Sequence, residues 1–135
     1  MTGRNKGFSL IEVVAVMAMI ALALTLVGPR IGAGIGRLEL EQAAQNIRTF
    51  IKAGRSQAQR KDQEHYIVID KKNNSITLLD REMHQIRHEE LPSAIQVVSQ
   101  QGSETTNIFI APSGILRGEP IRIRGRSGEA EVVLE

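Results

Sequence analysis

The feature that most constrains the fold of this chain is an apolar run of 20 residues near the N-terminus, Phe8 to Val27. A helix of that length is about 30 Å long, which matches the hydrocarbon core of a bilayer. The run is apolar on every side, whereas a helix that covers the core of a domain has a polar face. We therefore predict a transmembrane helix over residues 8–27 rather than a buried core helix.

Two basic residues before this run, Arg4 and Lys6, predict its orientation. Cytoplasmic flanks of membrane helices carry an excess of lysine and arginine, so we expect the N-terminus in the cytoplasm and the bulk of the chain on the other side. Arg30 and Arg37, beyond the run, act against this orientation. Arg4 and Lys6 also account for the formal net charge of +2, so overall charge does not indicate nucleic-acid binding.

An ordinary secretory signal peptide is the alternative interpretation of this region. Its basic part would be residues 1–7, and cleavage would follow the small-x-small triplet Ala21-Leu22-Ala23. Glu12 argues against it, because a charge inside the apolar part is costly and a discarded segment has no use for one.

Glu12 needs a positive partner that the apolar run does not contain. An ionised carboxylate close to hydrocarbon is destabilising unless it is paired. No lysine, arginine or histidine lies between Phe8 and Val27. Cleavage between Gly7 and Phe8 would create an α-amino group four residues before Glu12, on the same helix face. The same amine on a neighbouring molecule would also pair with Glu12 and would stagger the helices of an assembly.

The residues around this bond, GFSLIEV from Gly7 to Val13, resemble the class III signal of type IV pilins and type II secretion pseudopilins. The resemblance implies that a prepilin peptidase cleaves after Gly7 and that Phe8 is then N-methylated. It gives Glu12 a role in assembly. It also implies a helix kink at Pro29, where the family often has a proline.

A glycine-rich segment, residues 28–37, follows the apolar run and predicts a flexible break in a long helix. Each glycine in a helix costs roughly 1 kcal/mol of helix stability relative to alanine. The pattern Gly32-x-Gly34-x-Gly36 has neither the spacing nor the preceding strand of a nucleotide-binding loop, so no phosphate site is expected there.

The remainder of the chain predicts one amphipathic helix followed by strands. Apolar residues recur at spacings of three and four over about residues 38–61, which gives one apolar stripe. Residues 65–135 are rich in isoleucine and valine between turn formers. The expected strands are His65–Asp70, Ser75–Leu79, Gln85–Glu89, Ile95–Ser99, Asn107–Ile110, Pro120–Arg124 and Glu129–Leu134. Pairing of consecutive strands predicts an α+β fold, with a long N-terminal helix packed on antiparallel β-sheets.

This layout is similar to that of the H-type minor pseudopilins and of the FimT and FimU minor pilins. The segment Asn107 to Gly125, NIFIAPSGILRGEPIRIRG, resembles the end of their domain. The sequence lacks the tyrosine- and proline-rich region of a major pseudopilin, and it is too short for the J and K types. The resemblance implies a leader (1–7), a membrane helix (8–27), the break (28–37) and a periplasmic domain (38–135).

The resemblance also implies a structural role rather than catalysis. The chain would be a single-pass inner-membrane subunit at or near the tip of a type II secretion pseudopilus. Its partners would be other pseudopilins through the N-terminal helix, the prepilin peptidase and methyltransferase, and secreted proteins. The alternative is a type IV minor pilin of the FimT or FimU sort, for which DNA binding in natural transformation is one function to test.

No arrangement of residues in the sequence indicates an enzyme, a metal or a cofactor. Cysteine is absent, and no serine lies in a G-x-S-x-G motif. His84, His88, Glu89 and Glu90 would share a metal site only in a helix, and we predict an extended segment there. His65 is expected as an edge residue at the junction between the helix and the first strand.

Four arginines near the C-terminus are the candidate nucleic-acid contacts. They are Arg117, Arg122, Arg124 and Arg126. In a strand, Arg122 and Arg124 project from one face while Ile121 and Ile123 project from the other. Such a ridge of guanidinium groups is able to bind phosphates.

A solvated strand face is the simpler interpretation of the same arginines. Glu119, Glu129 and Glu131 are available nearby to pair with them. Aromatic residues that stack on bases are missing from this part of the sequence, which weakens the case for DNA further.

Overall fold

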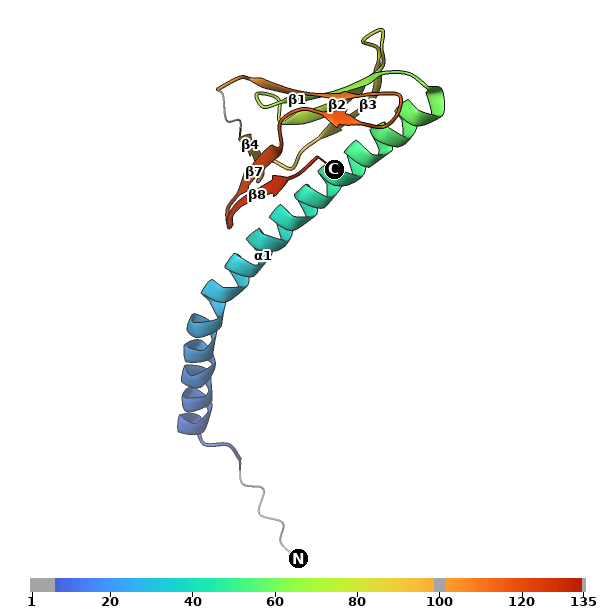
Figure 1. Cartoon of the computed structure of the whole chain (residues 1–135). Coiled ribbons are helices and arrows are strands. Elements are labelled where there is room, and N and C mark those ends of the chain that lie inside the picture. Colours follow the sequence, from blue (N-terminus) through green and yellow to red (C-terminus); the bar gives the residue numbers. More distant parts are fainter. Residues whose placement is uncertain (1–6, 99–101, 135) are drawn as a thin grey trace, which may run out of the picture. The chain divides into compact units, whose positions relative to one another are not determined.

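The computed structural model describes residues 7–98 and 102–134, with the side chains of all of these except residues 27–33. One α-helix and eight β-strands lie within the described residues (Figure 1). The chain divides into two compact units, Met1–Gly34 and Ile35–Glu135.

Helix α1 runs from Leu10 to Lys61. It is continuous through residues 28–37, where the sequence predicts a break, so the glycines do not end the helix. The cost of a glycine is modest beside the cooperative hydrogen bonding of a long helix. The boundary between the two units falls in the same segment, after Gly34. The kink at Pro29 concerns a residue whose side chain is not described and stays a prediction.

The part of α1 in the first unit exposes apolar side chains. Large apolar residues from Phe8 to Leu26 are all exposed, including Leu10 at 83% and Leu26 at 71%. Within the described residues, no helix is both apolar and long enough to cross a membrane.

Five antiparallel strands form the larger sheet of the second unit. In spatial order they are β3 (Gln85–Glu90), β2 (Ser75–Leu79), β1 (His65–Asp70), β5 (Thr105–Ile110) and β6 (Leu116–Arg117). The central strand, β1, pairs Tyr66 with Leu79 of β2 and with Phe109 of β5. Its alternate residues His65, Ile67 and Ile69 are buried.

A second, three-stranded antiparallel sheet consists of β4 (Gln96–Val98), β7 (Ile121–Gly125) and β8 (Gly128–Val132). The central strand, β7, pairs Ile123 with Val97 of β4 and with Ala130 of β8. Both sheets lie on the same side of the C-terminal part of α1 (Figure 1). The α+β fold class predicted from the sequence is confirmed.

The pairing of strands differs in part from the consecutive order that we expected. Four pairs are consecutive, but β1 pairs with β5 and β4 pairs with β7. The reason is that β4, β7 and β8 form a separate sheet, so that the chain leaves the larger sheet after β3 and returns to it at β5. The seven predicted strands are present. The first two have the predicted ends, the other five have shifted ends, and Ser99 of the fourth lies outside the described residues.

The core of the second unit lies between α1 and the two sheets. The helix contributes an apolar stripe of seven buried residues, Leu40, Ala43, Ala44, Ile47, Phe50, Ile51 and Ala58. This stripe packs on buried isoleucines of the strands, such as Ile67 and Ile108. At Gly54 a Cβ atom would lie 3.0 Å from Leu78 Cδ1 and 3.1 Å from Ile110 Cδ1. The glycine therefore lets the helix approach the larger sheet closely.

Candidate functional site

The predicted processing site lies in a short non-helical segment before α1. Residues 7–9 are not helical, and the carbonyl oxygen of Ser9 accepts hydrogen bonds from the backbone N–H groups of Glu12 (3.0 Å) and Val13 (3.3 Å). Ser9 is therefore the N-cap residue, and Glu12 is the third residue of the helix. Phe8 is 81% exposed, so the bond between Gly7 and Phe8 is accessible.

The order Ser9-Leu10-Ile11-Glu12 is also that of a capping box, a feature that our sequence analysis missed. In a capping box the N-cap serine and the acid three residues later satisfy N–H groups at the start of a helix. An acid in the first turn is also favoured by the helix dipole. Glu12 thus has a local structural role available to it in addition to the predicted pairing with an amine.

Gly7 has no structural reason to be glycine within the described residues. A Cβ atom at this position would meet nothing within 4 Å, and the backbone is not in the left-handed region. This contrasts with Gly54, where a side chain would collide with the sheet. Arg4 and Lys6, the basic residues of the predicted leader, lie outside the described residues.

The four arginines are divided between three places. Arg122 and Arg124 lie in β7, Arg126 lies in the turn that follows, and Arg117 lies in β6 of the other sheet. The predicted alternation in β7 is confirmed, because Ile121 and Ile123 are buried while Arg124 is exposed. The arginines therefore do not form one ridge along a single strand.

The face of β7 that carries its arginines is opposed by acids. Arg122 and Arg124 face Glu131 and Glu129 of β8 in the register of the hairpin. Arg124 Nε donates a hydrogen bond to Glu129 Oε1 at 2.7 Å, and Arg124 Nη2 forms an ion pair with the same carboxylate. Cross-strand pairs of opposite charge stabilise a hairpin. This geometry favours the solvated, internally paired strand face.

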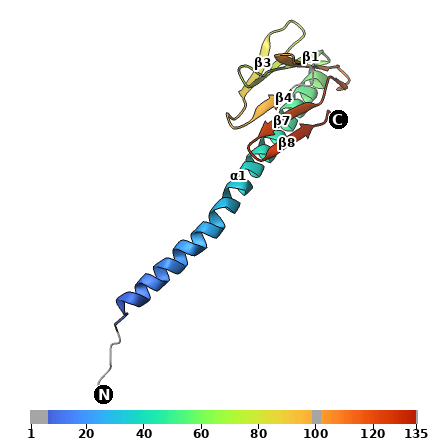
Figure 2. The same ribbon diagram turned by 90° about the vertical axis from the view of Figure 1, so that its left-hand side faces the viewer.

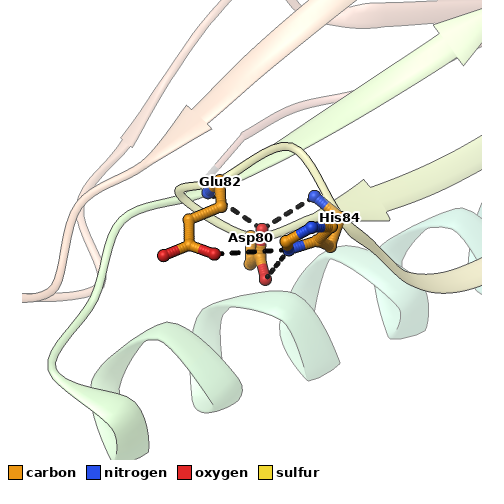
Figure 3. A network of polar contacts seen from close by, with 3 residues as sticks. All are labelled: Asp80, Glu82 and His84. Atoms are coloured by element: carbon orange, nitrogen blue, oxygen red, sulfur yellow. Dashed lines mark hydrogen bonds and ion pairs between the residues drawn. The ribbon is translucent and has the colours of Figure 1, made fainter.

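The two histidines of the β2–β3 hairpin, His84 and His88, have separate partners. His84 lies in the turn between β2 and β3, where its Nδ1 is 3.5 Å from both Asp80 Oδ2 and Glu82 Oε2 (Figure 3). His88 lies in β3, where its Nδ1 is 2.8 Å from Thr77 Oγ1. The segment is extended, as predicted. In the described part of the chain, no group of three potential ligands is placed to hold a metal ion.

Asp80 organises the turn that contains His84. Its Oδ1 accepts hydrogen bonds from the backbone N–H groups of His84 (2.8 Å) and Glu82 (2.9 Å). The bond from His84 is the main reason that the pKa of Asp80 is lowered, with a further contribution from the Glu82 N–H. Met83 adopts a left-handed conformation, with φ of 65°. This network stabilises a β-turn on the surface.

His65 is fully buried, and our expectation of an edge residue was wrong. It begins β1, which lies at the centre of the larger sheet because β5 pairs along its second side. His65 Nδ1 lies 3.0 Å from the carbonyl oxygen of Gln63, and its Nε2 is buried without a partner among the described residues. The non-consecutive pairing of β5 is the feature that the sequence did not indicate.

Comparison with known proteins supports the interpretation of the N-terminus. Residues 2–28 match the prokaryotic N-terminal methylation motif. No curated protein and no solved structure matches the chain. The chain therefore carries the methylation motif that is typical of type IV pilin-like proteins and pseudopilins, which are structural subunits. Its α+β architecture is a pilin-like arrangement.

Proposed function

We propose that the chain is a minor pseudopilin, a structural subunit at or near the tip of a type II secretion pseudopilus. The match of residues 2–28 to the N-terminal methylation motif carries this proposal. The precursor would be cleaved after Gly7 and methylated on the new amino group of Phe8. In this proposal the subunit has no catalytic activity and acts with the other pseudopilins in protein export.

The exposed apolar surface of the first unit supports a role in membrane anchoring and assembly. Side chains from Phe8 to Leu26 are exposed around the helix, a surface far larger than a protein leaves to water without a partner. In the proposed function, residues 8–27 lie in the inner membrane before assembly and pack against neighbouring helices in the fibre. The N-terminus would be cytoplasmic before processing, and residues 38–135 periplasmic.

The processing step is tested by the mass and the first residue of the mature protein. The chain is expressed in a host that has a prepilin peptidase, and in the same host without it. The expected product begins at Phe8 and carries the mass of one added methyl group, and only in the presence of the peptidase. A product that begins at Leu24 would mean cleavage as an ordinary signal peptide and would overturn the proposal.

A Gly7 variant tests whether the peptidase recognises this glycine. The described structure gives Gly7 no packing role, so Gly7→Leu is expected to fold like the native chain and to keep its seven leading residues. Processing that continues normally in this variant would contradict recognition of Gly7 by the peptidase.

A further inference from the structure

The turn between β7 and β8 packs against α1 at the start of the second unit (Figure 1, Figure 2). A Cβ atom at Gly36 would lie 3.5 Å from Ser127 Cβ and 3.7 Å from Arg126 Cβ. One turn further along the helix, Leu40 Cδ1 lies 3.3 Å from the Cβ position of Gly125. Gly36 and Leu40 are both buried. The turn is therefore held on the helix at this end of the second unit.

Two arginines at this contact have no partner within the chain. Arg37 follows Gly36 on the helix, Arg126 lies in the turn, and both are exposed. Within the described residues, neither side chain forms an ion pair or a hydrogen bond. Arg124, in contrast, is paired with Glu129. The positive charge of Arg37 and Arg126 is therefore available to a partner outside the chain.

Exposed aliphatic side chains accompany these two arginines. Ile35 and Leu38 of the same helix are 54% and 63% exposed. They lie three residues apart and therefore share a face of the helix. Exposed aliphatic and arginine side chains together are typical of a surface that contacts the headgroup region of a bilayer, because the aliphatic groups leave water while the charged groups remain beside phosphates.

The position of this surface in the chain indicates which partner it meets. Gly36 lies nine residues after Val27, the last residue of the proposed membrane helix, and α1 is continuous between them. Nine helical residues span about 14 Å. The polar layer on each side of a bilayer is about 5 to 8 Å deep. The remaining gap is comparable to the Debye length of about 8 Å at physiological salt, so the arginines are within electrostatic reach of the headgroups.

The charges that follow the proposed membrane helix are basic before any acid occurs. Residues 28–38 contain Arg30 and Arg37 and neither aspartate nor glutamate, and Glu39 is the first acid beyond the apolar run. A membrane surface at the end of the apolar run therefore meets basic residues first. Each lysine or arginine near an acidic membrane surface favours binding by about fivefold. Acidic lipids are thus preferred over neutral ones.

We propose that Ile35, Arg37, Leu38 and Arg126 form a headgroup surface, which binds acidic phospholipids of the membrane in which the chain is anchored. The guanidinium groups contact lipid phosphates, and the two aliphatic side chains lie among the headgroups. This inference rests on the proposed function, because it requires residues 8–27 to lie in the membrane. Its consequence is that the second unit is held on an acidic membrane surface before the subunit enters a fibre.

A fluorescent label in the turn tests this contact on the full-length protein. The chain has no cysteine, so Ser127→Cys gives one labelling site. The labelled chain is reconstituted in nanodiscs of phosphatidylcholine alone, or of phosphatidylcholine and phosphatidylglycerol in equal parts, with the same amount of a lipid that carries a nitroxide quencher on its headgroup. We expect stronger quenching in the acidic nanodiscs, which high salt abolishes by screening. Equal quenching in both compositions would overturn the proposal.

A second label, Ser113→Cys, shows whether the contact belongs to this end of the second unit. The carbonyl oxygen of Ser113 accepts a hydrogen bond from Gln59 Nε2 (3.0 Å), and Gln59 lies about 34 Å further along α1 than Gly36. We expect little quenching at Ser113 in either composition. Quenching that increases equally at both labels in acidic nanodiscs would contradict the headgroup surface.

Removal of the two charges provides a matched pair of variants on the Ser127→Cys background. Arg37→Gln with Arg126→Gln is expected to lower the ratio of quenched to unquenched label in acidic nanodiscs by about tenfold or more. The control, Arg48→Gln with Lys52→Gln, makes the same change of net charge further along α1 and is expected to behave like the native chain. An equal loss in both double variants would mean non-specific attraction and would overturn the assignment.

The anchoring on which this inference rests has a separate readout. Size-exclusion chromatography shows whether the labelled chain elutes with the nanodiscs. A chain that enters neither composition would contradict anchoring, and this inference with it. A chain that enters both compositions and is quenched equally in each would contradict the lipid contact alone, and would leave Arg37 and Arg126 to the acidic groups of a protein partner.

Discussion

The position of Glu12 at the start of α1 allows two physical roles, and each has a different requirement. As the third residue of the helix it is placed to complete a capping box with Ser9. As a partner of an α-amino group it must be ionised. A capping box accepts glutamine as well as glutamate, whereas pairing with a cation does not. The two roles are therefore separable by substitution.

We predict that Glu12→Gln leaves the start of the helix intact but prevents entry into a pilus-like fibre. The variant keeps the capping side chain and loses only the charge. Incorporation is measured as the fraction of the subunit in sheared fibres, next to Ser9→Ala, which removes the cap and keeps the acid. Normal incorporation of Glu12→Gln, or a larger loss in Ser9→Ala, would assign Glu12 to capping and refute the charge pair.

Gly54 is a residue at which helix α1 packs closely on the larger sheet. Its Cβ position lies 3.0 Å from a methyl group of Leu78, so a larger side chain must displace the sheet. We predict that Gly54→Leu lowers the free energy of unfolding by about 1 to 3 kcal/mol. Urea unfolding of the full chain in detergent measures this, with Ser56→Leu at an exposed position of the same helix as the control. Equal stability of the two variants would show that the close contact is unimportant.

Among the elements, the turn between β2 and β3 makes a prediction about pH. The hydrogen bond from the His84 N–H, aided by that from Glu82, lowers the pKa of Asp80 in the folded chain below its unfolded value of about 3.9. The ionised carboxylate therefore stabilises the turn at pH values above the unfolded pKa. This stabilisation is lost as the pH falls through the folded pKa.

We predict that Asp80→Ala lowers the midpoint of thermal unfolding more at neutral pH than at about pH 3, near or below the pKa of an ordinary aspartate. Asp80→Asn keeps a side-chain acceptor for the turn and removes the titration, so its midpoint should depend less on pH than that of the native chain. Unfolding is followed by circular dichroism across this range. A loss in Asp80→Ala that does not change with pH would contradict the role of the ionised carboxylate.

Local patterns in the sequence predicted most elements of the second unit but not their pairing. The alternation in β7 identified Ile121 and Ile123 as core residues, and this is confirmed by their burial. The two-residue strand β6 is too short to show any alternation. The burial of His65 depends on β5, which lies about forty residues away in the sequence, and no local pattern contains that information.

The candidate sites also differ in whether their residues are adjacent in the sequence. The processing motif is a run of adjacent residues, so it is visible in the sequence and agrees with the match of residues 2–28. A hollow of the second unit lined by Arg48, Leu116 and Val133, by contrast, joins three distant segments and appears only in the fold. The pairing of Arg124 with Glu129 was foreseeable, because the two residues flank a short turn.

At the scale of the whole molecule, the sheet arrangement bears on the alternative function of DNA binding. Phosphate contacts release counterions, so the logarithm of the binding constant falls with the logarithm of salt concentration by about 0.9 per contact. The candidate arginines are divided between two sheets, and Arg124 is paired with Glu129. We therefore predict that the full-length protein shows no steep salt dependence with duplex DNA.

The acids of β8 provide the matched experiment for this prediction. Glu129→Gln with Glu131→Gln removes the carboxylates that oppose Arg122 and Arg124 in the hairpin register. If these acids neutralise the basic face, the double variant gains weak, salt-sensitive DNA binding that the native chain lacks, measured by fluorescence anisotropy of a labelled duplex across a salt series. The prediction would be wrong if the native chain bound DNA with a slope that corresponds to three or four phosphate contacts, and if Arg122→Gln with Arg124→Gln abolished that binding. The arginine face would then be a DNA-binding surface, and the pilin-like subunit would belong to an uptake machine rather than a secretion machine.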